Sequence, residues 1–143
     1  MSNVDKYMPL KEGEEVICEL KGNAYTMSSN ILGKILGLIA RILAAITGSL
    51  RSIEINVTHH RVLVFERQKM FWFFDKSISV RSYSPRTISL VGYTMQKNLF
   101  IFRNHYLEFI ASSTSMLIKA RGGKDKVLTT IGAITDMVGR QNK

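Results

Sequence analysis

Cysteine and proline are scarce in this sequence, with one cysteine, Cys18, and two prolines in 143 residues. A single cysteine can form neither an internal disulfide nor a thiolate metal cluster, which excludes a small disulfide scaffold and a zinc finger and favours a reducing compartment. The first residues lack the basic and then apolar pattern of a secretory signal. We therefore expect a cytoplasmic protein. No run of five or more like charges occurs, so no basic arm is predicted.

The common catalytic and nucleotide-binding motifs are missing as well. No G-x-x-x-x-G-K-[ST], G-x-G-x-x-G or G-x-S-x-G segment occurs. His59 and His60 are adjacent, so on a strand they point to opposite faces and cannot share a metal ion; the third histidine is His105. Cys18 alternates with apolar neighbours, which favours a buried, inert thiol. We expect no catalytic residue, no metal site, no cofactor and no enzymatic activity.

The chain has 20 Lys+Arg against 11 Asp+Glu, a formal net charge of +9, and 45% hydrophobic residues. This length and hydrophobic fraction suit one ordinary domain with a core. The positive charge favours nucleic acid, an anionic membrane or an acidic protein face as partner. The basic residues are dispersed, so a solvated surface is the simplest interpretation for most of them.

We expect a flexible lead-in over residues 1–13 and a single domain over residues 14–143. The lead-in is polar and ends in a glycine. Alternating apolar residues predict a first strand within residues 14–27 and several short strands between Arg51 and Ile118. Because consecutive strands are joined by short connections, the sheet should be mostly antiparallel.

Particular segments refine this prediction. The run Val62–Phe65 is apolar at every position, which is typical of a strand covered on both faces. Pro85 should break the strand pattern. Residues 99–103 and 106–111 are predicted strands, with a tight turn at Arg103–His105 between them.

An amphipathic helix is predicted over residues 31–47, inserted after the first strand. At 100° per residue all its large aliphatic side chains fall on one half of the helix, and small and basic residues fall on the other. Three uses of this helix stay open: packing onto a sheet or another subunit, lying in a membrane interface, or spanning a membrane with Arg41 near its middle. Its candidate membrane- or partner-contact residues are Ile31, Leu32, Lys34, Ile35, Leu36, Ile39, Arg41, Ile42, Leu43 and Ile46.

A second candidate contact segment combines aromatic and basic residues. In the simplest interpretation it is an ordinary strand whose alternate aromatics fill the core. In the other, an aromatic pair faces outward beside basic residues, which suits a membrane interface or a protein contact. Its candidate residues are Arg67, Lys69, Phe71, Trp72, Phe73, Phe74 and Lys76.

The chain ends in a predicted helix over residues 123–139. Its stripe of apolar side chains should face the sheet, and a helix at the chain end can cap one end of a curved antiparallel sheet. The predicted stripe consists of Val127, Leu128, Ile131, Ile134 and Val138. We therefore predict an α+β fold that is mainly antiparallel β.

This order of elements resembles the pleckstrin-homology-like superfold, in particular small bacterial domains of that type. Residues 55–65, with His59-His60 in the turn, resemble the strand, T-N-K-R, strand hairpin of the family. Residues 77–88 resemble its I-x-x-x-x-I strand pair, and residues 123–139 would be its capping helix. The resemblance implies a curved sheet or barrel, and a binding or assembly module without catalysis.

The sequence departs from that family in two ways. The helix over residues 31–47 would be an insertion into the minimal fold. Lipid-binding members carry a Lys followed by a Lys/Arg-x-Arg pattern in their first hairpin, and Arg51-Ser52-Ile53 does not complete such a pattern after Lys21. Recognition of phosphoinositides therefore does not carry over.

From the sequence we expect a non-enzymatic adaptor. Its amphipathic helix and aromatic-basic segment would contact other protein subunits, including further copies of the chain in a homo-oligomer. Alternatively, they would contact the anionic surface at the inner face of a membrane. The alternative is a basic β-domain that binds nucleic acid on strand aromatics such as Tyr93 and Tyr106. That alternative is weaker because no ribonucleoprotein-type motif is present.

Overall fold

The computed structural model describes residues 3–25, 39, 42, 51–71, 73–98 and 101–141. In chain order its elements are α1 (Asn3–Tyr7), β1 (Val16–Tyr25), β2 (Arg51–Thr58), β3 (Val62–Met70), β4 (Phe74–Tyr83), the 3-10 helix η1 (Pro85–Thr87), β5 (Ile88–Asn98), β6 (Phe102–Ala111), β7 (Thr114–Ala120) and α3 (Gly123–Gln141).

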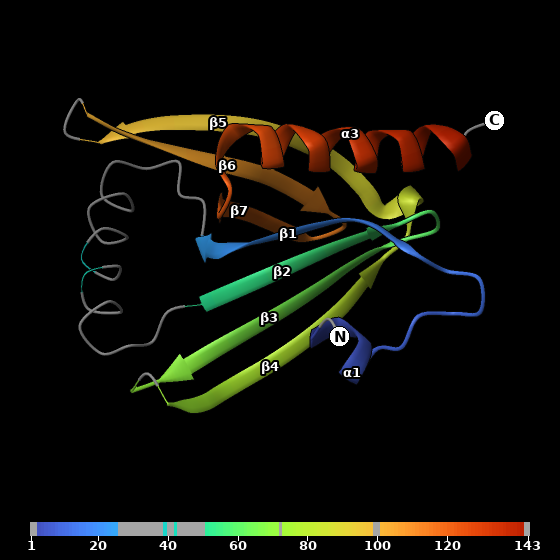
Figure 1. Cartoon of the computed structure of the whole chain (residues 1–143), viewed down its shortest axis with the longest axis horizontal. Coiled ribbons are helices and arrows are strands. Elements are labelled where there is room, and N and C mark those ends of the chain that lie inside the picture. Colours follow the sequence, from blue (N-terminus) through green and yellow to red (C-terminus); the bar gives the residue numbers. More distant parts are fainter. Residues whose placement is uncertain are drawn as a thin grey trace.

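The seven strands form one antiparallel sheet in the order β4-β3-β2-β1-β7-β6-β5. The sheet is curved but not closed, and β4 and β5 form its two edges (Figure 1). The predicted α+β class, the antiparallel sheet and the C-terminal helix are confirmed. The predicted helix over residues 31–47 falls outside the described residues except at Ile39 and Ile42.

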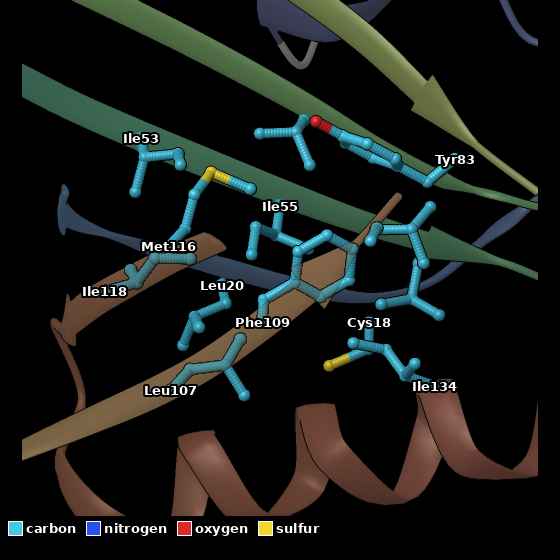
Figure 2. Close-up of a cluster of buried hydrophobic side chains, with 14 of the residues drawn as sticks. Cys18, Leu20, Ile53, Ile55, Tyr83, Leu107, Phe109, Met116, Ile118 and Ile134 are labelled. Carbon is cyan, nitrogen blue, oxygen red and sulfur yellow. The ribbon is translucent and has the colours of Figure 1, made fainter. Parts of the chain in front are cut away.

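The main core lies between the sheet and α3, which packs against β1, β5 and β6. Side chains from both halves of the sheet meet in this core. Tyr83 of β4 contacts Phe109 of β6 edge to face, with 5.3 Å between the ring centroids (Figure 2). The predicted apolar stripe of α3 is confirmed at Val127 and Ile134, which are fully buried. Leu128 is exposed instead, because it lies about 100° around the helix from Val127.

A second apolar cluster lies on the outer face of the sheet, opposite α3. Leu63 and Phe65 of β3 are buried there under Met8 and Leu10, and Tyr7 stacks on Phe65 with 5.7 Å between ring centroids. Val62 and Val64 of the same strand belong to the main core. The prediction that this strand is covered on both faces is thus confirmed, and the N-terminal segment that includes α1 supplies the outer cover.

A buried ion pair ties this N-terminal segment to the β2–β3 turn. Arg61 Nη2 lies 2.8 Å from Glu14 Oε2, and the Thr58 hydroxyl donates to Glu14 Oε1 at 2.8 Å. The backbone N–H of Lys11 donates to Glu14 Oε2 at 2.9 Å. The bond from Arg61 is the main reason that the pKa of Glu14 falls from 4.5 to about 2. The carboxylate is therefore charged at neutral pH and fully committed to these partners.

The turns between strands are partly as predicted. Pro85 begins η1 and separates β4 from β5, which confirms the predicted break. The predicted turn at Arg103–His105 is wrong, because these residues lie within β6, paired with residues 95–97 of β5. This end of the β5–β6 hairpin extends beyond the main core, where polar side chains are compatible with a strand.

Candidate functional site

The β3–β4 hairpin ends in exposed aromatic residues. Met70 and Phe74 are the last paired residues, so the run between them forms the tip of the hairpin. Phe71, Phe73 and Phe74 are 60%, 83% and 66% exposed. The interpretation that these aromatics fill the core as a strand is therefore wrong, because the chain reverses direction within the run.

The backbone of this tip is also unusual. Phe71 has a φ of 51°, in the left-handed region that bulky residues rarely adopt. An exposed phenylalanine in that conformation does not stabilise the domain through core packing, and its backbone conformation is unfavourable. Tight hairpin turns use this conformation, and Ser112 in the β6–β7 turn has a φ of 52°, so the φ of Phe71 marks where the chain reverses.

A second hairpin carries apolar residues at its tip. Ile101, between β5 and β6, and Phe102, the first residue of β6, are 79% and 63% exposed. In Figure 1 this tip lies at the same end of the long axis of the molecule as the β3–β4 tip. The sequence analysis missed Ile101 and Phe102 because residues 99–102 are apolar at every position, a pattern that predicts a strand covered on both faces as well as it predicts an exposed tip.

Basic side chains stand directly behind both tips. Lys69 and Lys76 flank the β3–β4 tip, and Lys97 and Arg103 flank the β5–β6 tip. None of these four takes part in an ion pair within the part of the chain that the structure describes. Lys97 and Arg103 are direct cross-strand partners, an arrangement of like charges that disfavours the hairpin unless an anion is nearby. We name the two tips and these four cations the apolar-basic end.

Arg67 differs from the other basic candidates of its segment. Its Nε lies 3.6 Å from Asp75 Oδ1, and its guanidinium lies 5.4 Å from the centre of the Phe65 ring. The side chain is partly buried on the outer face of the sheet and is not part of the hairpin tip.

The connection between β1 and β2 also leaves and re-enters the sheet near the β3–β4 tip, since Arg51 at the start of β2 pairs with Gln68 near the end of β3. Two candidate residues of this connection are described, Ile39 and Ile42; both are helical and about half exposed, so neither is buried in the domain core. The other candidates, Ile31, Leu32, Lys34, Ile35, Leu36, Arg41, Leu43 and Ile46, together with Trp72, lie outside the described residues.

The titratable side chains considered for chemistry do not converge. His105 Nδ1 lies 2.8 Å from the Tyr93 hydroxyl, and His59 Nδ1 lies 3.3 Å from Arg140. Cys18 is buried with its Sγ 3.4 Å from the Thr130 hydroxyl. Among the described residues, no group of three His, Cys, Asp or Glu side chains is placed to hold a metal ion.

No helix within the described ranges is long and apolar enough to cross a membrane. No family model, curated protein or solved structure matches the chain.

Proposed function

We propose that the protein is a non-enzymatic module that attaches to an anionic membrane surface through its apolar-basic end. The observation that carries this proposal is the exposure of Phe71, Phe73, Phe74, Ile101 and Phe102 on two hairpin tips at one end of the molecule (Figure 1). Scattered apolar side chains on a surface need no explanation, whereas a concentrated aromatic group indicates a contact site.

The layout of charge favours a membrane over a protein partner. Lys69 and Lys76 are one and two residues from the last paired residues of the β3–β4 hairpin, about 3 to 7 Å along the strands. Aromatic side chains inserted at the headgroup level would place these cations at lipid phosphates. Each Lys or Arg near an anionic leaflet contributes about 1 kcal/mol to the free energy of membrane binding. Full burial of an apolar side chain contributes roughly 1.5–3 kcal/mol, and each inserted aromatic contributes part of that amount.

The exposed Ile39 and Ile42 support a contribution from the β1–β2 connection to the same contact. In this proposal the aliphatic half predicted for residues 31–47 lies in the membrane interface and Lys34 and Arg41 reach the phosphates. The protein would then be peripheral, at the cytoplasmic face of the membrane.

The strand order and the capping helix α3 also support the resemblance to the pleckstrin-homology-like superfold. We include membership of that superfold in the proposal. Domains of that kind serve binding and assembly, which agrees with the proposed role.

Flotation with vesicles tests the proposal. We compare the wild-type chain, the double variant Phe71→Ser/Phe73→Ser and a control variant, Leu128→Ser, which removes an exposed apolar side chain from α3. With vesicles containing phosphatidylserine, the wild type and the control should float, and the double variant should partition at least tenfold less. Neutral phosphatidylcholine vesicles should retain far less of all three.

Light scattering behind size exclusion, without lipid, tests the alternative that the contact is with other copies of the chain. If the wild type forms a defined oligomer and fails to float, while the double variant is a monomer, homo-oligomeric assembly would replace the membrane proposal. Equal flotation of the double variant and the wild type would also overturn it, because the tips would then not be the contact.

A further inference from the structure

A second candidate site lies on the outer face of the sheet, away from the hairpin tips. It is a cavity of about 150 Å³ that is open to solvent. Its lining comes from α1, three neighbouring strands and the residue that follows β7. The lining residues that matter here are Lys21, Ser52, Glu54, Phe65, Arg67 and Arg121.

Strand register explains why these side chains share one face. Lys21 pairs with Glu54, and Glu54 pairs with Phe65, so the three form one row across β1, β2 and β3. Ser52 and Arg67 form the adjacent row on the same face. The register therefore brings cations from separate strands to one place.

The pairing of β1 with β7 places the third cation, Arg121. The backbone N–H of Arg121 donates to the carbonyl of Lys21 at 2.8 Å, which holds Arg121 beside the first row. This approach requires Gly22, because a Cβ at that position would lie 2.2 Å from the Lys119 carbonyl oxygen. A larger residue would force the two strands apart and separate Lys21 from Arg121.

Two of the three cations have unused binding capacity. Arg67 Nε is buried and donates no hydrogen bond, since Asp75 at 3.6 Å is beyond hydrogen-bond distance. A buried donor without a hydrogen bond is unfavourable, and the ion pair with Asp75 at 3.6 Å offsets this only in part. Arg121 takes part in none of the ion pairs within the described ranges. Lys21 is paired with Glu19 at 2.9 Å, but both side chains are well exposed, so this pair is weak.

Glu54 is the one carboxylate in the lining, and it is already engaged. Asn3 donates to Glu54 Oε2 at 3.3 Å and Asn56 donates to Oε1 at 3.1 Å. Within the lining three cations face this one carboxylate, while Glu19 and Asp75, outside the lining, are the ion-pair partners of Lys21 and Arg67; Arg121 has no such partner within the described ranges. Because the cations approach from different elements, they suit a ligand with several oxygens better than a planar carboxylate.

We propose that this cavity binds a phosphate monoester, with Arg67 and Arg121 donating to its oxygens, Lys21 as a further cation and Ser52 at the rim. A monoester carries close to two negative charges at neutral pH and three strong acceptor oxygens, which suits donors that approach from different elements. The group can belong to a soluble metabolite or to a lipid headgroup. The inference does not depend on the proposed membrane role, because it uses different residues.

Side-chain NMR tests the site directly. We follow the Nε–H resonances of the arginines and the backbone amide of Gly22 while adding inorganic phosphate, with sodium chloride at matched ionic strength as reference. Saturable changes should appear at Arg67, Arg121 and Gly22 with phosphate but not with chloride. In Arg121→Gln the affinity should fall at least tenfold, and in the control Arg86→Gln, an exposed arginine in η1, it should stay within twofold. An equal response to chloride, or equal changes at every arginine, overturns the proposal.

Two further ligands identify the source of the phosphate. Tight, Arg121-dependent binding of glycerol 3-phosphate, with no preference of the chain for phosphatidic acid vesicles over phosphatidylserine vesicles of equal charge, identifies a soluble ester. A preference for phosphatidic acid vesicles that Arg121→Gln abolishes identifies a headgroup. If neither ester binds in an Arg121-dependent way, the proposal fails, and vesicle flotation through the aromatic tips is unaffected.

Discussion

Replacement of Glu14 by glutamine should destabilise the fold in a manner that depends on pH. The carboxylate is buried and accepts from Arg61, Thr58 and the backbone of Lys11. Its pKa falls from 4.5 to about 2 on folding, which corresponds to about 3 kcal/mol at 1.36 kcal/mol per unit. That is a large share of the stability of about 5–15 kcal/mol typical of a single domain.

The sign follows from the direction of the shift. A carboxyl whose pKa is lowered in the folded state stabilises the protein fully above its unfolded pKa, and this contribution is lost as pH falls through the folded pKa. The advantage of the wild type over Glu14→Gln should therefore be about 3 kcal/mol near pH 7, begin to shrink near pH 4.5 and be nearly gone at pH 2.

Urea unfolding followed by far-ultraviolet circular dichroism at pH 7, 4.5, 3 and 2 measures this difference. Glu12→Gln is the matched control, because Glu12 is exposed and lies two residues away; we expect it to change stability by less than about 0.5 kcal/mol at every pH. A difference between the wild type and Glu14→Gln that stays constant from pH 7 to pH 2 would refute the reasoning.

Three further predictions concern packing. Gly22→Ala should lower the free energy of unfolding by about 1–3 kcal/mol in urea titrations, because the new Cβ would overlap the Lys119 carbonyl. Tyr7→Ala should speed limited proteolysis near the N-terminus while leaving the main core intact, because Tyr7 stacks only on Phe65 of the outer cluster. Cys18 should react with a thiol reagent only after unfolding, since the side chain is buried in the core.

The strands and the closing helix were predictable because their apolar periods are strong and local. Ile53, Ile55 and Val57 alternate with polar residues, which predicts a half-buried strand; β2 forms there and these three side chains lie in the main core, but the polar residues Glu54, Asn56 and Thr58 are buried too. The continuous run Val62–Phe65 correctly indicated two covered faces. What covers the outer face was not predictable, because a polar N-terminal segment with only Tyr7, Met8 and Leu10 to bury carries no period of its own.

Pairings between distant residues were also outside the reach of sequence patterns. Glu14 and Arg61 are 47 residues apart, and their ion pair depends on how the N-terminal segment returns to the β2–β3 turn. The convergence of Lys21, Arg67 and Arg121 depends on strand order and register in the same way. Local patterns leave both of these undetermined.

The aromatic segment shows a different limit. Phe71–Phe74 was predicted either to fill the core or to face outward, and its composition suits both. The decision depends on where the hairpin reverses, and the left-handed conformation of Phe71 marks that position. Identical ambiguity hid the second tip at Ile101 and Phe102.

The most direct test of attachment through the apolar-basic end uses the single tryptophan of the chain, Trp72, which lies in sequence between Phe71 and Phe73. Its fluorescence is recorded with phosphatidylserine vesicles that contain brominated lipids, at a lipid concentration at which flotation shows the protein bound. Attachment through the tips predicts a blue shift of the emission and strong quenching by bromine. Emission that stays unshifted and unquenched under those conditions would contradict the account, because the protein would then be bound by another surface.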